Sequence, residues 1–141
     1  MDKGIGAAAL IRDQAGRVLL VRHTYGRLNW ELPGGVVERN ESPSEAVVRE
    51  VREETGIQTE VISLLGHYYE PAEDRLHYVF ECGGNGTAPV ANSAEISECQ
   101  FFDSNDLPRP ISDFTIRRIE DALSGAKIPL PANVPVREWF E

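Results

Sequence analysis

Apolar residues fall in short runs separated by turn-forming residues over the first third of the chain. Residues 5–12 are mostly apolar and end at a turn signal in residues 13–16. Residues 17–22, R-V-L-L-V-R, predict a short strand that forms the second half of a hairpin. Residues 30–32 predict another strand, which stops at residues 33–35, where two glycines favour a backbone bend. The pattern therefore predicts β-structure for this region.

The next segment predicts an α-helix whose two ends are both marked. Ser42 is a favourable N-cap, and Pro43 suits the first helical position. Glu45 lies three residues after Ser42 and completes a capping box. Gly56 suits the position just past the helix end. We therefore expect helix from Pro43 to about Thr55.

The rest of the chain gives both strand and helix signals. Strands are predicted at residues 57–69, 75–82 and 97–102, and apolar residues at helical spacing predict a second helix over residues 111–123. The tail, residues 128–141, contains three prolines and is expected to pack as extended chain. The predicted fold class is α+β, with a mixed β-sheet and two main helices in a single domain over residues 1–141.

Charge and composition restrict the classes of function. The chain has 141 residues and a formal net charge of −9, which argues against a nucleic-acid surface that works through bulk positive charge. The first ten residues lack the long apolar region of a signal peptide, and no stretch has the length of a membrane span. Cys82 and Cys99 match no metal or redox spacing. We therefore expect a cytoplasmic protein with ordinary thiols.

One face of the predicted helix is strongly acidic. Glu50, Glu53 and Glu54 have i, i+3, i+4 spacing, which places them within about a quarter-turn of one another. Val47 and Val51 fall on an adjoining stripe that can face the core. Three crowded carboxylates repel one another, and a hard cation such as Mg²⁺ or Mn²⁺ would relieve that repulsion. A solvated acidic face without a ligand is the alternative interpretation.

The loop before the helix favours the metal interpretation. Gly34 and Gly35 place bare backbone near the carboxylates, where a carbonyl oxygen can also bind metal. Arg49 lies four residues before Glu53 and can bridge to a carboxylate at the start of the loop, such as Glu41. A short ordered loop, a cation and a carboxylate cluster together are typical of a site for phosphate and metal.

The residues in and around this helix resemble the Nudix box. The matching positions are Gly35, Glu41, Arg49-Glu50-Val51, Glu53-Glu54 and Gly56-Ile57, at the spacing of that motif. The preceding W-E-L-P-G-G, residues 30–35, and the later residues 95–102, followed by Leu107-Pro108, are also similar to the family's pattern. The resemblance therefore extends over most of the chain.

This resemblance implies a fold and a reaction. The fold is an α/β/α sandwich with a mixed β-sheet and a strand-loop-helix-loop catalytic box. The reaction is the attack of water on phosphorus in a nucleoside diphosphate linked to another group, X, with Mg²⁺ or Mn²⁺ as cofactor. The implied metal ligands are Glu50, Glu53, Glu54 and the Gly34 carbonyl, with Arg49 as an orienting arginine and Glu41 as its partner.

The resemblance leaves the general base open. In some members of the family the base is a box glutamate that matches Glu50 or Glu53. In others the base comes from a downstream loop, where Glu95 and Glu98 are the candidates in this sequence. The sequence alone does not choose between these two positions, because the pKa of a carboxylate depends on its surroundings.

The group X must be recognised outside the box. Arg22 and Arg27 flank a polar, aromatic loop just before the box and are candidates for phosphate binding, and Tyr25 is a candidate for stacking on a base. Ordinary surface arginines and a packing tyrosine are the alternative. Pro71 lies near the place of a loose marker of ADP-ribose-cleaving members, although a proline in a turn needs no function.

Three functional hypotheses follow. The first is a hydrolase that acts on a small nucleotide, such as ADP-ribose, another nucleotide sugar, a dinucleotide or a nucleoside triphosphate. The second is a catalytically silent domain that senses a nucleotide, against which the intact Arg49 and glutamates argue. The third is an RNA 5′-end pyrophosphohydrolase, against which the acidic charge argues. Trp139 and Phe140 are expected to dock on the chain's own core or on a second subunit of a homodimer.

Overall fold

The protein is built from two five-stranded sheets and two α-helices, as seen in a computed structural model that describes residues 4–125 and 131–141. The first sheet contains, in order, β4 (Gly34–Val36), β1 (Gly4–Leu10), β6 (Arg75–Cys82), β5 (Val61–Glu70) and β9 (Ala132–Asn133). The second sheet contains β10 (Trp139–Phe140), β8 (Ile111–Ser112), β3 (Trp30–Glu31), β2 (Val18–His23) and β7 (Ile96–Phe102). The helices are α1 (Pro43–Thr55) and α2 (Asp113–Ser124), and a 3₁₀ turn covers Pro71–Glu73.

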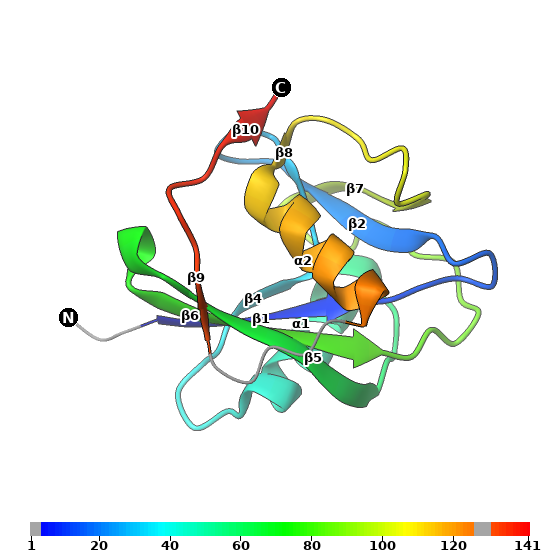
Figure 1. Cartoon of the computed structure of the whole chain (residues 1–141). Helices are drawn as coiled ribbons and strands as arrows, with labels where there is room; N and C mark the ends of the chain where they lie inside the picture. The colour runs from blue at the N-terminus through cyan, green and yellow to red at the C-terminus, as the bar shows by residue number, and fades with distance from the viewer. Residues whose placement is uncertain (1–3, 126–130) are drawn as a thin grey trace.

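Strand β1 is the centre of a sandwich because both of its faces are buried. Ala7 and Ala9 point toward α1, whereas Ala8 and Leu10 belong to the core cluster that also contains Phe114 of α2. Figure 1 shows β1, β5 and β6 between the two helices. Both sheets are mixed, since β1 runs parallel to β6 and β3 runs parallel to β8, while their other neighbours are largely antiparallel. The predicted α+β sandwich is confirmed.

Helix α1 forms over the predicted residues, and the cap residues explain both of its ends. The Ser42 side chain accepts a hydrogen bond from the Glu45 backbone N–H, and the Glu45 side chain accepts one from the Ser42 backbone N–H. Gly56 adopts a left-handed conformation with φ of 76° and donates its N–H to the Arg52 carbonyl. Val47 and Val51 are fully buried against β1. The acidic face of α1 therefore has a fixed orientation relative to the sheet.

The strand that begins at Trp30 stops where predicted, with a bend at Pro33, but the two glycines that follow form a strand. Gly34 and Gly35 lie in β4, which pairs with β1. Glycine is required here for space, because a Cβ on Gly34 would lie 2.2 Å from the carbonyl oxygen of Ala7. A Cβ on Gly35 would lie 2.6 Å from the Glu50 carboxyl group. The chain instead changes sheets at residues 32–33, between β3 and β4.

Three other predictions need correction. The turn at residues 13–16 forms, but β1 and β2 part into different sheets, and only Arg12 and Val18 make a bridge of the expected hairpin. The strand predicted from residue 57 begins at Val61, because residues 57–60 follow the helix end without a strand partner among the described residues. The second helix begins at Asp113, since Ser112 is its N-cap and pairs in β8.

The end of the chain docks on the protein itself. Trp139 pairs with Ser112 and Phe140 with Ile111, so that β10 extends the second sheet. The guanidinium of Arg27 lies 4.6 Å from the Trp139 ring centroid. Docking within the chain is confirmed for Trp139 and Phe140, while residues 128–130 of the predicted extended tail lie outside the described residues. In the described part of the chain, neither helix combines the length and apolarity that a membrane crossing requires.

The capping box predicts a measurable effect on stability. Ser42→Ala should lower the free energy of unfolding by about 1 kcal/mol, because the Glu45 N–H loses its acceptor. Ser42→Asn should retain most of the stability, since asparagine is an equally favourable N-cap. Urea denaturation of the three proteins measures the difference. Equal stability of wild type and Ser42→Ala would show that the cap contributes nothing.

Candidate functional site

Arg49 organises the carboxylates of the box. Its Nε donates to Glu41 Oε2 at 2.7 Å and its Nη2 donates to Glu41 Oε1 at 3.0 Å, which makes a two-pronged contact. Its Nη1 donates to Glu50 at 2.8 Å and to Glu53 at 3.2 Å. The hydrogen bond from Arg49 lowers the pKa of Glu41 to about 2. The structure thus brings together the predicted pair, Arg49 and Glu41, and links it to two of the three predicted metal ligands.

Glu54 is a buried carboxylate with one described hydrogen-bond partner. Only 6% of the residue is exposed, and its Oε1 accepts a hydrogen bond at 2.9 Å from the Gly34 N–H. Burial raises the pKa of Glu54 to about 8, and the nearby carboxylates of Glu50, Glu31 and Glu95 act in the same direction. Burial likewise raises the pKa of Glu50, against the opposing effect of Arg49. At neutral pH, Glu54 is therefore mostly protonated unless a cation stabilises its charged form.

A groove beside α1, which we call the carboxylate groove, collects these side chains. Its lining consists of Glu50, Arg52, Glu53, Glu54, Asn92, Ser93, Ala94 and Glu95. The loop that carries Glu95 is tied to the helix end, because the Asn92 backbone N–H donates to the Glu54 carbonyl. Thr24 fixes the other side of the loop through hydrogen bonds to Ala94 and Glu95 carbonyls. Of the two downstream candidates, Glu95 thus lies with the box carboxylates.

Glu98 has a different environment. It lies on β7, where its Oε2 is 3.3 Å from Arg22 Nη1, and half of its side chain is exposed. Arg22 also donates to the Leu28 carbonyl. Neither residue belongs to the described lining of the carboxylate groove. The geometry therefore favours Glu95 over Glu98 as the downstream carboxylate that can reach the reacting groups.

The chemistry of this donor set suits a hard divalent cation. The groove offers carboxylate oxygens from Glu50, Glu53, Glu54 and Glu95, and oxygen is the ligand atom that Mg²⁺ and Mn²⁺ prefer. A cation would also favour the charged form of buried Glu54. Across the described residues, no three acidic, histidine or cysteine side chains are already arranged as a metal-ligand set. Arg49 holds Glu50 and Glu53 in the present arrangement.

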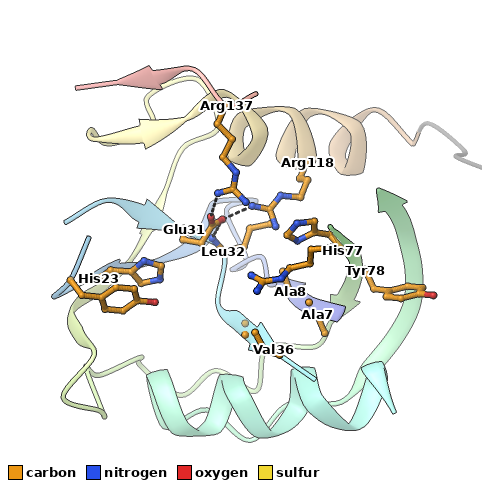
Figure 2. A pocket seen from close by; sticks show the side chains of 15 residues that line it. Ala7, Ala8, His23, Glu31, Leu32, Val36, His77, Tyr78, Arg118 and Arg137 are labelled. Carbon is orange, nitrogen blue, oxygen red and sulfur yellow. Dashed lines mark hydrogen bonds and ion pairs between the residues drawn. The ribbon is translucent and has the colours of Figure 1, made fainter. Parts of the chain in front are cut away.

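A second cavity lies on the other side of Gly34 and Gly35, between the two sheets, and we call it the sheet pocket (Figure 2). Its lining consists of Gly6, Ala7, Ala8, His23, Tyr25, Glu31, Leu32, Gly34, Gly35, Val36, Arg75, His77, Tyr78, Arg118 and Arg137. The two glycines belong to this lining and also contact the box through Glu54 and Glu50. A ligand that spans both cavities would therefore pass along the β4 backbone.

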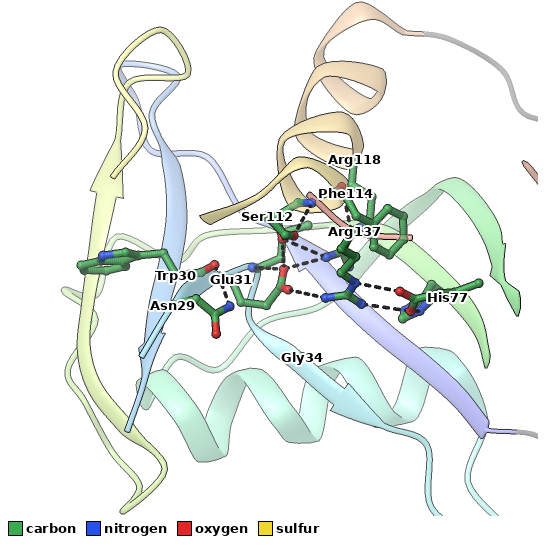
Figure 3. A network of polar contacts seen from close by, with 12 residues as sticks. Asn29, Trp30, Glu31, Gly34, His77, Ser112, Phe114, Arg118 and Arg137 are labelled. Carbon is green, nitrogen blue, oxygen red and sulfur yellow. Dashed lines mark hydrogen bonds and ion pairs between the residues drawn. The ribbon is translucent and has the colours of Figure 1, made fainter. Parts of the chain in front are cut away.

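The wall of the sheet pocket is an ionic network (Figure 3). Arg118 Nη2 donates to Glu31 Oε1 at 2.7 Å, and Thr115 donates to the same oxygen at 2.8 Å. Burial alone would raise the pKa of Glu31, but Arg118 and Arg137 outweigh it and lower the pKa. The guanidinium of Arg118 also lies 4.1 Å from the Phe114 ring centroid. These contacts hold one arginine of the wall in a fixed position.

The same wall fixes a second arginine and a histidine. Arg137 donates to both Glu70 oxygens, at 2.8 and 3.0 Å, and the His77 Nε2 lies 2.9 Å from Glu70 Oε1. Burial and the nearby Arg118 lower the pKa of His77 to about 4, so its ring is neutral at neutral pH. Burial alone would raise the pKa of Glu70, but its hydrogen bonds from Arg137 and His77 lower it. Glu70 is therefore ionised and accepts the His77 Nε2 hydrogen.

The residues predicted to bind the group X occupy different places. Tyr25 lines the sheet pocket and stacks on His23, with ring centroids 4.7 Å apart. Burial raises the pKa of Tyr25, and the charge of Glu95 acts in the same direction. Arg27 pairs with Glu141 at 3.1 Å, and Arg22 pairs with Glu98. Within the described lining of the two cavities, neither arginine contributes.

The sequence analysis missed the charged residues of the sheet pocket. Arg118 gave one signal, because it lies four residues after Phe114, next to Ile119, on the apolar face of the second helix. A charged residue that is 4% exposed requires a partner, and Glu31 supplies it. Arg137 and Arg75 gave no comparable signal, since their positions depend on contacts between distant parts of the chain.

Comparisons with known proteins agree with this fold. The family model described as NUDIX domain matches residues 2–122. The chain is 34% identical over 122 residues to a MutT-like protein of Streptomyces ambofaciens, covering 86% of this chain and 78% of that protein. It is 36% identical over 108 residues to an ADP-ribose pyrophosphatase of Methanocaldococcus jannaschii, covering 70% and 62%. The crystal structure of a MutT NUDIX hydrolase from Burkholderia pseudomallei superposes with a TM-score of 0.76 at 27% identity, covering 86% and 98%.

The fold is a sandwich of mixed sheets between two helices, and it places a capped acidic helix after a glycine pair. This arrangement is that of the phosphoanhydride hydrolases that carry the Nudix box. With the family model matching most of the chain, the protein belongs to the Nudix hydrolase family. Members of this family act on nucleoside diphosphates linked to other groups and generally use divalent metals. The chain is therefore a Nudix-type pyrophosphohydrolase.

The contacts of Arg49 predict that lysine cannot replace it. Arg49→Lys should reduce turnover by roughly 10- to 100-fold, the scale for losing a group that orients metal ligands. A single ammonium cannot reproduce the two-pronged contact with Glu41 while also holding Glu50. Steady-state kinetics measure the loss, and Arg39→Lys, at an exposed position, is the matched control. Normal turnover of Arg49→Lys at an unchanged melting temperature would contradict an orienting role.

Proposed function

We propose that this protein hydrolyses a phosphoanhydride bond in a small nucleoside diphosphate derivative with the help of Mg²⁺ or Mn²⁺. The observation that carries the proposal is the buried carboxylate of Glu54, whose pKa is raised to about 8 beside Glu50 in one groove. A solvated acidic face would not bury a carboxylate at this cost. Because Glu54 is buried next to other acidic groups, a cationic ligand would stabilise its charged form.

The residues of the carboxylate groove would have different roles in this reaction. Glu50, Glu53, Glu54 and the Gly34 carbonyl would hold the divalent ion, which, when bound, neutralises phosphate oxygens and lowers the pKa of the attacking water. Arg49 and Glu41 orient Glu50 and Glu53, since Arg49 contacts all three carboxylates. The Gly34 N–H orients Glu54. The close backbone of β4 admits the diphosphate without a side chain in its way.

Two carboxylates of the groove can accept the proton of the attacking water. Glu53 is half exposed and contacts Arg49 through one oxygen only, which leaves its other oxygen accessible. Glu95 lies across the same groove on the loop fixed by Thr24 and Asn92. Glu98 is held by Arg22 and is the weaker candidate. Separate Glu53→Gln and Glu95→Gln variants distinguish the two, because the loss of the base removes the dependence of turnover on its pKa.

The substrate is a small nucleotide with its group X in the sheet pocket. Tyr25, which lines this pocket, is the candidate for stacking on a ring of that substrate. An ADP-ribose-like substrate is supported by the relative that is named an ADP-ribose pyrophosphatase. Pro71 adds nothing to this assignment, since it starts the 3₁₀ turn. Product analysis against a panel of nucleotide sugars, dinucleotides, nucleoside triphosphates and 5′-triphosphorylated RNA tests the substrate class.

Metal dependence has two measurable consequences. Excess chelator should abolish hydrolysis, and Mg²⁺ should raise the melting temperature, because a ligand that binds only the folded state stabilises it by about 2.7 kcal/mol at a hundred times its dissociation constant. Glu54→Gln should remove most of the Mg²⁺-dependent rise, since it replaces the buried carboxylate by a neutral amide. Differential scanning fluorimetry with and without Mg²⁺ measures both proteins. Full turnover in chelator would exclude the metal-assisted reaction.

Glu53→Gln separates catalysis from a merely acidic surface. We expect turnover to fall by roughly 10²-fold or more, the scale for the loss of a charged metal ligand or base. The melting temperature should change little, because Glu53 is half exposed and also repels its acidic neighbours. Glu120→Gln, at an exposed position of α2, controls for the loss of a negative charge. Unchanged turnover and unchanged Mg²⁺ affinity in Glu53→Gln would favour a catalytically silent nucleotide sensor.

A further inference from the structure

The sheet pocket contains one arginine without a described counter-charge. Arg118 is paired with Glu31 and Arg137 is paired with Glu70, each at hydrogen-bond distance. Arg75 lines the same pocket, and its side chain forms no hydrogen bond or ion pair with another described residue. Its Nε is buried and has no hydrogen-bond partner in the described part of the chain. A buried donor without an acceptor is costly, so this guanidinium is a candidate for a ligand contact.

The backbone of β1 explains why Arg75 can lie in the pocket. Arg75 pairs with Gly4 and His77 pairs with Gly6, so that two residues without side chains lie opposite these two long ones. A Cβ on Gly4 would lie 3.0 Å from Arg75 Nε, and a Cβ on Gly6 would lie 3.7 Å from Arg75 Cδ. The side chain of Arg75 therefore lies across β1. Gly4 and Gly6 leave the space that the Arg75 side chain occupies.

The register of β1 also separates Arg75 from the bond that is cleaved. Gly4 pairs with Arg75, whereas Ala8 pairs with Gly34 on the other side of β1. Four residues of strand correspond to roughly 13 Å. Neighbouring phosphates of one chain lie much closer together than this, so a diphosphate bound beside Gly34 would not extend to the strand position of Arg75. A group at Arg75 belongs to the far end of a nucleoside or sugar.

His77 adds a complementary acceptor beside Arg75. Its Nε2 hydrogen is donated to Glu70, so its Nδ1 carries no hydrogen and can accept one. A Cβ on Gly6 would lie 3.2 Å from this Nδ1, so the nitrogen lies next to Gly6 (His77 is labelled in Figure 2). The pocket therefore offers a charged donor next to a neutral acceptor. This pair matches a sugar that carries both a hydroxyl and an anionic group.

We propose that Arg75 is a specificity-determining residue that binds an anionic substituent, a phosphate or a carboxylate, on the part of the substrate farthest from the cleaved bond. The inference rests on the proposed hydrolysis, because it assigns one end of the same substrate to the sheet pocket. The preferred substrates are then nucleoside diphosphate derivatives that carry one anionic group in addition to the diphosphate.

The test compares matched pairs of substrates that differ only in this anion. NADPH against NADH tests a ribose phosphate, and UDP-glucuronate against UDP-glucose tests a sugar carboxylate. The ratio of kcat/KM within each pair is measured in Mg²⁺ for wild type, Arg75→Gln and Arg75→Lys. In at least one pair we expect wild type to favour the anionic member by about 10- to 100-fold, the range for a hydrogen bond to a charged group. Arg75→Gln should bring that ratio close to one, and Arg75→Lys should restore part of it.

A binding measurement separates this inference from the proposed function. Calorimetry in chelator compares 2′,5′-ADP with 5′-AMP, and glucuronate 1-phosphate with glucose 1-phosphate, on wild type and Arg75→Gln. Arg109→Gln, an exposed arginine outside both cavities, controls for net charge. Tighter binding of an anionic member that disappears only in Arg75→Gln supports the inference even if hydrolysis is not observed. The absence of an anionic preference in wild type, or a preference that survives in Arg75→Gln, overturns it.

Discussion

The close contact of β4 with β1 and α1 is the constraint on which the site depends. Gly34 lies so near the β1 backbone that a single additional carbon would overlap the Ala7 carbonyl, and an additional carbon on Gly35 would overlap the Glu50 carboxyl group. This contact brings the Gly34 N–H to Glu54 and forces the acidic side of α1 against the sheet. A side chain at position 34 would displace β4 from β1, and one at position 35 would displace the Glu50 carboxyl group. Either change would disturb the arrangement of the box carboxylates.

Arg49 reduces the repulsion among the crowded carboxylates of the folded protein. One guanidinium contacts Glu41, Glu50 and Glu53, so the acidic face has its own cation even before any ligand arrives. The buried Glu54 lies beyond the reach of these described contacts and carries the largest rise in pKa among the box carboxylates. The acidic face of α1 thus has a cationic partner at its exposed edge and none among the described contacts where Glu54 meets the sheet. The proposed divalent ion would stabilise the charged form of Glu54 at the second of these places, next to the β4 backbone.

The sequence predicted those features that depend on neighbours in the chain. The ends of α1 follow from Ser42, Glu45 and Gly56, and the acidic face follows from spacing alone. The strand at Gly34 could not be predicted in this way, because it exists only through pairing with β1. For the same reason, Arg22 and Arg27 seemed suitable for phosphate, although the structure gives them carboxylate partners elsewhere. Arg118 and Arg137 of the sheet pocket depend on Glu31 and Glu70, which lie 87 and 67 residues away.

These sequence separations divide the site into two parts with different folding requirements. The side-chain contacts among the box residues join positions at most 20 residues apart, as in Glu41 with Arg49 and Gly34 with Glu54. The wall of the sheet pocket closes only when α2 and the segment that carries Arg137 have returned to the early strands. Closing the longer loops costs more chain entropy. A local opening at the α2 edge would consequently release the wall of the pocket while the box stays intact.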